Sequence, residues 1–174
     1  MILKSNIATR SLPILLILIT GCKPKYTLTG INTKAESFQV KFFQNFADQS
    51  PGSTIAPQLD RDFTIALQDY INNSTNLSLT RNNGELFYEG EIVEYRVSPM
   101  SSTANETASQ NRLTMGVNVR FHDNTKYNSD FEKRFTFFYD FPSTVLLESI
   151  KKQAHKVLFE RITKDIFNAS LVNW

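Results

Sequence analysis

Three glutamates near the middle of the chain, Glu89, Glu91 and Glu94, come closest to a catalytic cluster. Residues two apart on a strand point to the same face, so the carboxylates of Glu89 and Glu91 are expected about 7 Å apart. That separation resembles the spacing of the two carboxyl groups in glycoside hydrolases. No nucleophile, base and orienting group accompany the pair. We therefore favour a solvated strand face over a hydrolase site, and expect a protein that is not an enzyme.

Arginines on the neighbouring predicted strands form the second candidate site. The guanidinium group binds phosphate oxygens through parallel hydrogen bonds. Arg112, Arg120 and Arg134 could therefore contact an anionic lipid head group from the open face of a sheet. In the alternative interpretation, Arg112 and Arg120 are neutralised by Asp140 and Glu132, their expected cross-strand neighbours.

Few residues are available for a metal site. Cys22 is the only cysteine, which excludes an intrachain disulfide and a cysteine-rich zinc site. His122 and His155 are the only histidines, and both are predicted at the surface, at a strand end and on the polar side of the last helix. We expect neither a metal nor a cofactor.

The first 21 residues have the parts of a bacterial secretory signal. Lys4 and Arg10 form a basic region, and an apolar run follows at 12–19. This run is shorter than the roughly 20 residues that cross a bilayer, and its length is typical of a signal peptide. Gly21 followed by Cys22 resembles a lipobox, the site at which a bacterial lipoprotein is cleaved and acylated. The alternatives are an ordinary signal peptide with a chance cysteine, or a short buried helix.

These features predict residues 1–21 as a signal peptide and 22–174 as a single domain anchored to the membrane through acylated Cys22. Lys23, in place of the aspartate that favours inner-membrane retention in enterobacteria, suggests the outer membrane. No acidic run of the kind that resembles a surface-export signal follows Cys22, so we expect the domain to face the periplasm. Loss of Lys4 and Arg10 would take the formal net charge from +2 to zero. A neutral chain gives no support for nucleic-acid binding.

Apolar periodicity predicts an α+β domain of order β-α-β-β-β-α. Period-two alternation predicts four strands and 3.6-residue spacing predicts two helices. The strands are expected at 37–43, 86–97, 112–122 and 130–141, and the helices at 57–71 and 144–172. Two helices on one face of a four-stranded, mostly antiparallel sheet is the layering that buries both apolar surfaces.

Local signals refine this outline. Pro57 suits the first turn of one helix and Thr144 could cap the other. A bulge near Gly90 would reconcile the mixed parity of its strand, and 99–110 is polar and predicted to be a loop. A hairpin centred near Lys126 places apolar residues opposite one another on one face. On its other face, this register pairs Arg120 with Glu132 and Arg112 with Asp140.

Several segments together resemble the LptE family of lipopolysaccharide-assembly lipoproteins in its Bacteroidota form. The most telling segments are FYEGEI at 87–92, with Tyr95 and Pro99, NRLT at 111–114 and the terminal NW at 173–174. The resemblance covers nearly the whole chain and carries no active site. Only Cys22, as the lipidated residue, transfers by position.

The resemblance implies a two-helix, four-strand sandwich that sits inside the outer-membrane barrel LptD as a plug and assembly partner. It also implies a part in delivering lipopolysaccharide to the outer leaflet, which some members bind directly. The alternative function is a generic periplasm-facing lipoprotein that binds another ligand or protein without a barrel partner. The polar lumen of a barrel would suit a plug with a mixed polar surface.

Overall fold

The computed structural model describes residues 33–49, 51–100, 109–126 and 129–172. The predicted signal peptide, Cys22, most of the predicted loop and the terminal NW lie outside these residues. The described elements, in chain order, are β1 (Ser37–Val40), β2 (Gln44–Asn45), the short 3-10 helix η2 (Ala47–Gln49), α1 (Leu59–Ser74), β3 (Ser78–Leu79), β4 (Leu86–Met100), β5 (Gln110–Asp123), β6 (Phe131–Pro142) and α2 (Leu147–Leu171).

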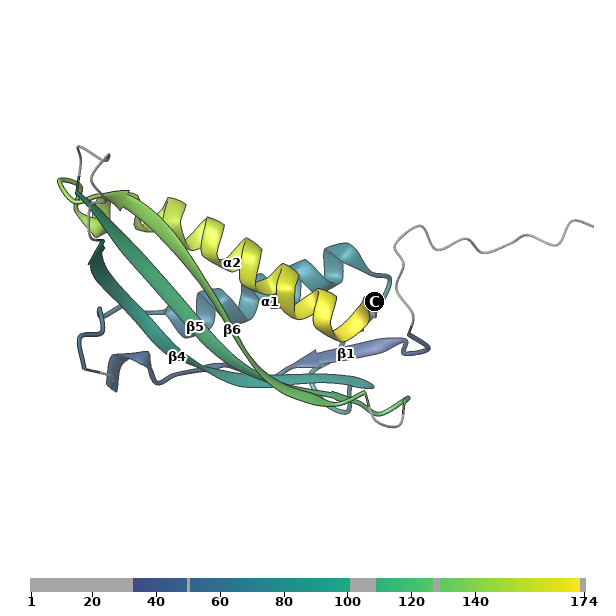
Figure 1. Ribbon diagram of the computed structural model, residues 1–174. Helices are drawn as coiled ribbons and strands as arrows, with labels where there is room; N and C mark the ends of the chain where they lie inside the picture. Colours follow the sequence, from purple (N-terminus) through teal and green to yellow (C-terminus); the bar gives the residue numbers. More distant parts are fainter. Residues whose placement is uncertain (1–32, 50, 101–108, 127–128, 173–174) are drawn as a thin grey trace, which may run out of the picture.

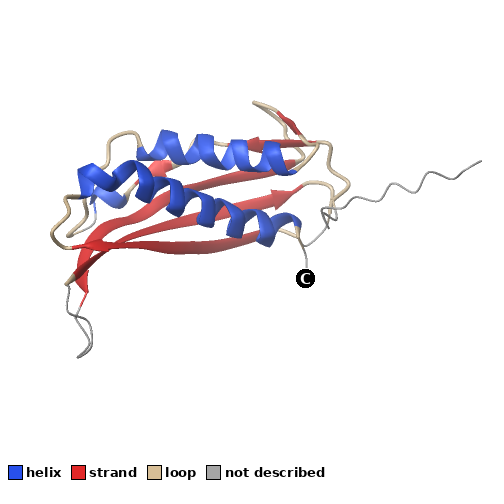
Figure 2. Ribbon diagram, turned by 90° about the horizontal axis from the view of Figure 1, so that it is seen from above, coloured by secondary structure: helices blue, strands red, loops and turns tan. Residues whose placement is uncertain are grey.

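The fold is α+β, as predicted, with both helices on one side of a single sheet (Figures 1 and 2). The strand order is β3-β1-β4-β5-β6, and β2 also pairs with β4. The long strands β4, β5 and β6 are antiparallel to one another. The short strand β1 pairs in parallel with β3 and β4, and β2 pairs in parallel with β4. The other face of the sheet is not covered by either helix (Figure 2).

The prediction of four strands was imprecise, because the described sheet has six. The predicted strand at 37–43 ends at Val40 as β1, and the separate two-residue strand β2 follows at Gln44–Asn45. Phe43, fully buried, donates its backbone N–H to Thr64 Oγ1 of α1 at 3.1 Å rather than to a strand. The chain therefore leaves the sheet to place this ring in the core and then returns. The other strand that was not predicted, β3, is only two residues long.

The alternating apolar residues of β5 form part of the core, as predicted. Leu113, Met115, Val117, Val119 and Phe121 are all fully buried beneath the helices. Because successive strand residues point to opposite faces, the residues between them line the uncovered side. The core continues into α1 and α2 through edge-to-face aromatic contacts, including Phe63 with Phe43 and with Phe159.

The predicted β5–β6 register is confirmed from end to end: Phe121 lies opposite Phe131 and Arg112 opposite Asp140. The predicted bulge exists, but between Ile92 and Glu94 rather than at Gly90. The predicted loop at 99–110 was too long, since β4 extends to Met100 and β5 begins at Gln110. Long strands paired on both sides gain ladder hydrogen bonds that outweigh weak local signals.

Both helices begin later than predicted. Helix α1 starts at Leu59, two residues after Pro57, and Gln58 precedes it with a left-handed φ of 65°. Helix α2 starts at Leu147, and Leu146, not Thr144, occupies the cap position without a side-chain hydrogen bond. Packing of the apolar side against the sheet, rather than capping, therefore sets where α2 begins.

Two tyrosines of β4 tie α2 to the sheet. The hydroxyl group of Tyr88 donates to Ser170 Oγ at 2.9 Å, and the Tyr95 hydroxyl group lies 2.9 Å from His155 Nε2. Burial raises the pKa of Tyr95 to about 12, so its proton stays in this contact. The prediction of a surface His155 was wrong: the ring is half-buried and packs on Phe159. Burial, and then the charge of Lys151, lowers its pKa.

Candidate binding face

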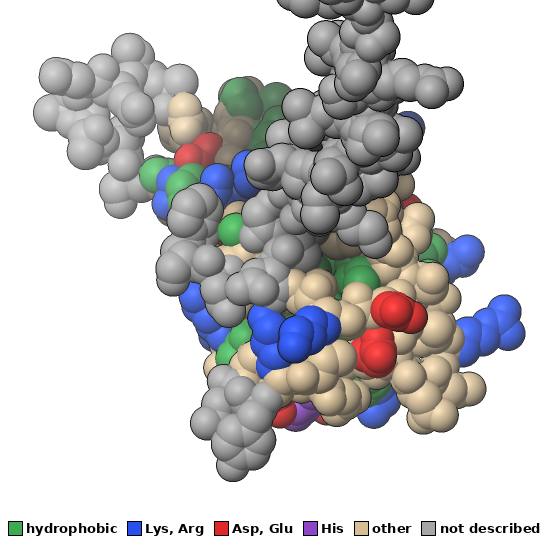
Figure 3. Space-filling view, turned by 90° about the vertical axis from the view of Figure 1, so that its right-hand side faces the viewer, with side chains coloured by type: hydrophobic (Ala, Val, Ile, Leu, Met, Phe, Trp, Pro, Cys, Tyr) green, Lys and Arg blue, Asp and Glu red, His purple; other side chains and the backbone are tan. Residues whose placement is uncertain are grey.

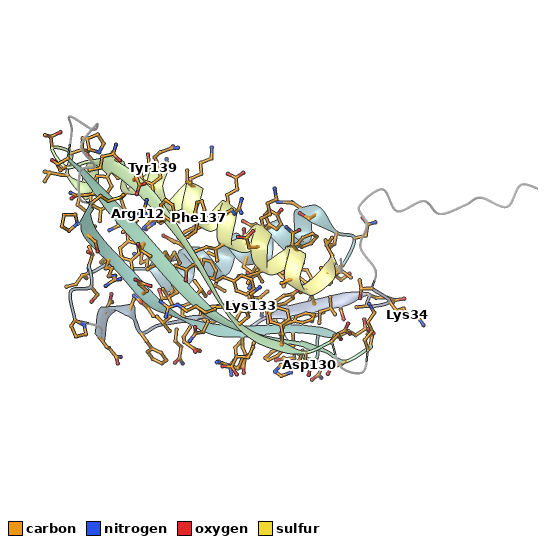
Figure 4. The ribbon with its side chains drawn as sticks, in the orientation of Figure 1. Lys34, Arg112, Asp130, Lys133, Phe137 and Tyr139 are labelled. Carbon is orange, nitrogen blue, oxygen red and sulfur yellow. The ribbon has the colours of Figure 1, made fainter. Side chains whose placement is uncertain are left out.

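The uncovered side of the sheet, here called the open face, carries the three predicted arginines. Arg112 and Arg120 project from β5 and Arg134 from β6, all at even-numbered positions opposite to the buried odd ones. The sequence therefore placed them on the correct face. Figure 4 shows Arg112 toward the end of the sheet away from Lys34, where the described chain begins.

Arg112 is paired as predicted. Its Nε and Nη2 donate to the two carboxylate oxygens of Asp140 at 2.7 and 2.8 Å. This bidentate geometry, chiefly through the side-chain hydrogen bonds, raises the pKa of Arg112. The guanidinium carbon also lies 3.6 Å from the ring centroid of Phe138. Two of the five N–H donors of Arg112 are used by Asp140.

Arg120 is neutralised by different partners from the one predicted. Its register neighbour is Glu132, yet its Nε donates to Glu89 at 3.1 Å and its Nη1 and Nη2 donate to Glu91 at 3.2 and 2.9 Å. Hydrogen bonds to Glu91 and Glu89 raise the pKa of Arg120 above its ordinary range. Glu89 also accepts from Lys41 at 3.1 Å. The guanidinium turns toward β4 because two carboxylates lie there, against one on β6.

Arg134 reaches across a whole strand. It donates to Glu94 of β4, with β5 lying between them. Gly116 makes this crossing possible: a Cβ atom there would lie 2.9 Å from Arg134 Nη2 and 3.1 Å from its Nε. Arg96 shares Glu94, with its Nε 2.7 Å from the carboxylate. Any larger residue at position 116 would displace the arginine.

The open face thus carries a network of ion pairs. The network joins five cations to four carboxylates: Lys41, Arg96, Arg112, Arg120 and Arg134 with Glu89, Glu91, Glu94 and Asp140. Arg134 is the most available of the three predicted arginines, since its side chain is 51% exposed against 32% for the other two. Arg134 also uses the fewest of its N–H groups in hydrogen bonds within the described part of the chain: one, against two for Arg112 and three for Arg120.

The two glutamates that suggested a hydrolase do share a face, as predicted, but both bind Arg120. Hydrogen bonds from Lys41 and Arg120 lower the pKa of Glu89. A general acid of a glycoside hydrolase needs a raised pKa. The hollow beside these residues has a volume of about 150 Å³, smaller than the pockets that hold typical small ligands. This arrangement favours electrostatic contact over acid–base catalysis.

The remaining chemistry of the described residues is limited. His122 is exposed, as predicted, with its Nδ1 2.9 Å from Asp130. In the described ranges, no group of three His, Cys, Asp or Glu side chains is placed to hold a metal ion. No helix in the part of the chain that the structure describes has the length and hydropathy to cross a membrane. On the end of the molecule shown in Figure 3, charged side chains of both signs are visible and hydrophobic ones form only small patches.

Sequence reasoning missed Lys41, Glu94 and Gly116 as parts of the network. Lys41 and Gly116 follow the alternation of the predicted strands, so their face was available from the sequence. The face of Glu94 was not available from the sequence, because the bulge after Ile92 changes the face to which the following side chains point.

Comparisons with known proteins identify a family. The family model of LptE, described as lipopolysaccharide-assembly, matches residues 35–170. No curated protein matches the chain. Among solved structures, a minor lipoprotein from Acinetobacter baumannii is 13% identical, with a TM-score of 0.45, and 79% of this chain aligns with 96% of that one.

Two further solved structures are similarly distant. The hypothetical protein CT253 from Chlamydia trachomatis is 10% identical with a TM-score of 0.49, over 80% of this chain and 99% of that one. The rare lipoprotein B from Shewanella oneidensis is 7% identical with a TM-score of 0.41, over 75% and 89%.

Proposed function

Because this chain belongs to the LptE family of lipopolysaccharide-assembly proteins, we propose that it is a non-enzymatic lipoprotein of the outer membrane that plugs an LptD-like β-barrel and helps to assemble it. In this role it takes part in delivering lipopolysaccharide to the outer leaflet. The observation that carries the proposal is the family match over residues 35–170, which includes α1, all three long strands and all of α2 except its last residue.

The proposed anchor is Cys22, acylated after removal of residues 1–21, with residues 22–174 forming one domain that faces the periplasm and the barrel lumen. Ten residues lie between Cys22 and Thr33, the first described residue, which makes eleven steps from Cα to Cα. An extended chain of that length spans at most about 40 Å. The anchor therefore leaves the domain enough reach to enter a barrel from its periplasmic mouth.

The surface of the domain suits a polar lumen. Exposed large apolar side chains come from loops, α1, β3 and β6: Phe42, Phe46, Ile55, Ile65, Leu79, Phe138 and Leu146. A barrel interior presents mostly polar side chains to its contents. Charged groups of both signs on the open face could pair with such a wall without burying an unpaired charge.

We expect the barrel to purify with this protein. A C-terminally tagged copy, extracted from outer membranes in mild detergent, should carry a large β-barrel in a roughly one-to-one, heat-resistant complex. Depletion of the protein should then mislocalise lipopolysaccharide. Recovery of the lipoprotein alone, with the barrel intact in the same membranes, would contradict the plug proposal. The better account would then be a generic periplasm-facing lipoprotein with another ligand.

The proposed contacts with lipopolysaccharide are Arg112, Arg120 and Arg134, which could share their remaining N–H donors with its phosphate groups. We expect the variant Arg120→Gln/Arg134→Gln to bind lipopolysaccharide about tenfold more weakly or worse, since hydrogen bonds to charged groups contribute about 1.5–3 kcal/mol each. Arg134→Gln alone should have the larger single effect, because Arg134 is the most exposed of the three. Binding is measured by fluorescence titration of purified full-length protein.

The matched control is Arg61→Gln/Arg81→Gln, which removes the same charge from two exposed arginines of α1 and a turn. This control should bind as the wild type does. Equal affinity of the wild type and the Arg120→Gln/Arg134→Gln variant would overturn the assignment of these arginines. A circular dichroism melt of each variant checks that any loss of binding is not caused by unfolding.

A further inference from the structure

The outer edge of β6 is unpaired in the described sheet. β6 is last in the strand order and bonds only to β5. It is 12 residues long, about twice the usual strand. A long edge presents a row of backbone donors and acceptors that can pair with another strand.

The register identifies which backbone groups face outward. Ser143 N–H donates to the Ser109 carbonyl oxygen at 3.0 Å, in the same register as the rest of the β5–β6 ladder. Bonded and non-bonded pairs alternate along an antiparallel ladder, so the odd-numbered residues of β6 bond to β5. The even-numbered residues therefore point their N–H and C=O groups away from the sheet. They are Glu132, Arg134, Thr136, Phe138 and Asp140.

Pro142 agrees with this assignment. It occupies the next even-numbered position of β6, where its missing N–H removes no bond to β5. Between Pro142 and the charged residues at 132–134, the edge has no such protection. Residues 135–139, with the sequence FTFFY, are uncharged and have high strand propensity. The middle of the edge is therefore suited to pairing.

We propose that this edge pairs antiparallel with the same edge of a second copy of the chain, about a two-fold axis at Phe137. In that register Arg134 of each copy lies opposite Asp140 of the other, and Thr136 lies opposite Phe138. On the helix side, Phe137 meets Phe137 of the second copy and Phe135 meets Tyr139. Opposite charges and aromatic pairs across strands stabilise a sheet.

The other symmetric registers near this one pair the charged residues of the edge less favourably. Centring on Thr136 places Glu132 opposite Asp140, centring on Phe135 places Asp130 opposite Asp140, and centring on Arg134 places it opposite itself. Like charges directly opposite destabilise a sheet. Centring on Phe138 creates no pair of opposite charges. The sequence of the edge therefore selects one register, and a two-fold contact of this kind closes instead of growing into a fibre.

A groove beside the edge has room for the second copy. It has a volume of about 520 Å³ and lies between β6 and α2, with Phe135 on one side and Ala169 and Val172 on the other. Figure 4 shows Lys133, Phe137 and Tyr139 along β6 beside α2. In the selected register, Tyr139 of the second copy arrives opposite Phe135, at this groove. The inference does not rest on the proposed function, because it concerns the chain without a barrel, which would compete with the dimer.

Sedimentation of the full-length protein in detergent, without the barrel, should give a concentration-dependent dimer. Thr136→Lys should raise its dissociation constant at least tenfold, because the two lysines would lie diagonally across the new ladder beside Arg134. The control Thr114→Lys changes the same residue type on the same face, but on β5 away from the edge. It should leave the dimer unchanged.

Cross-linking tests the register. Phe137→Cys should form a disulfide across the two-fold axis, because paired strand residues have Cα atoms about 5 Å apart. Thr136→Cys should form at least fivefold less of the intermolecular disulfide. Should Phe137→Cys fold poorly, the exposed pair Thr136→Cys/Phe138→Cys replaces it. A monomer up to about 100 µM, or cross-linking by Thr136→Cys equal to that by Phe137→Cys, would overturn the proposal.

Discussion

Replacing Cys22 by serine is expected to abolish incorporation of labelled palmitate into the protein. Acylation requires the thiol group, and Cys22 is the only cysteine in the chain. Each buried methylene contributes about 0.8 kcal/mol to membrane binding, so loss of two or more acyl chains removes stable anchoring altogether. Metabolic labelling followed by immunoprecipitation measures the effect, and mass spectrometry of the N-terminal peptide identifies the modification.

The matched control is Lys23→Ser, which changes the adjacent residue and should keep the label at the wild-type level. A second variant, Lys23→Asp, should keep the label but shift the protein toward the inner membrane if the enterobacterial sorting rule applies. Label that persists after Cys22→Ser would contradict the lipoprotein assignment, because no other thiol exists in the sequence. The same result would leave the family membership and the fold intact.

Replacing Gly90 by alanine is expected to destabilise the fold by more than about 3 kcal/mol, which is large for a single methyl group. A Cβ atom at this position would lie 2.0 Å from the carbonyl oxygen of Asn118 and 2.8 Å from Cε1 of Phe43. The first is backbone in the central β4–β5 ladder, and the second belongs to a fully buried ring. Neither can move away without breaking strand pairing or core packing.

Urea unfolding followed by circular dichroism measures this effect as a lower midpoint with an unchanged slope. Gly52→Ala is the control, since a Cβ atom there meets nothing within 4 Å and only the left-handed φ of 77° opposes it. That strain costs about 1–2 kcal/mol. A Gly90→Ala midpoint equal to that of the wild type would show that the ladder can shift to admit a methyl group.

Part of the candidate site could be predicted from the sequence, and part could not. The sequence placed Arg112, Arg120 and Arg134 on one open face, because strand alternation is a local property that needs no knowledge of the neighbours. It also paired Arg112 with Asp140 correctly, since both lie in one hairpin. Arg120 was different: its partners Glu89 and Glu91 lie on β4, the strand on its other side. Choosing between two flanking strands requires the distances and exposures that only the assembled sheet provides.

What the sequence by itself determined was the layering and the β5–β6 register, because a shift of one residue would have exposed every apolar side chain of β5. Tertiary structure alone decided three other features. It ended the first strand at Val40, because Phe43 turns into the core and donates its backbone N–H to Thr64 of α1. It placed the bulge after Ile92, while Gly90 stays in register opposite Val119 and lies close against the carbonyl group of Asn118. It also half-buried His155, whose polar neighbours in the sequence gave no indication of its contact with Tyr95 of β4.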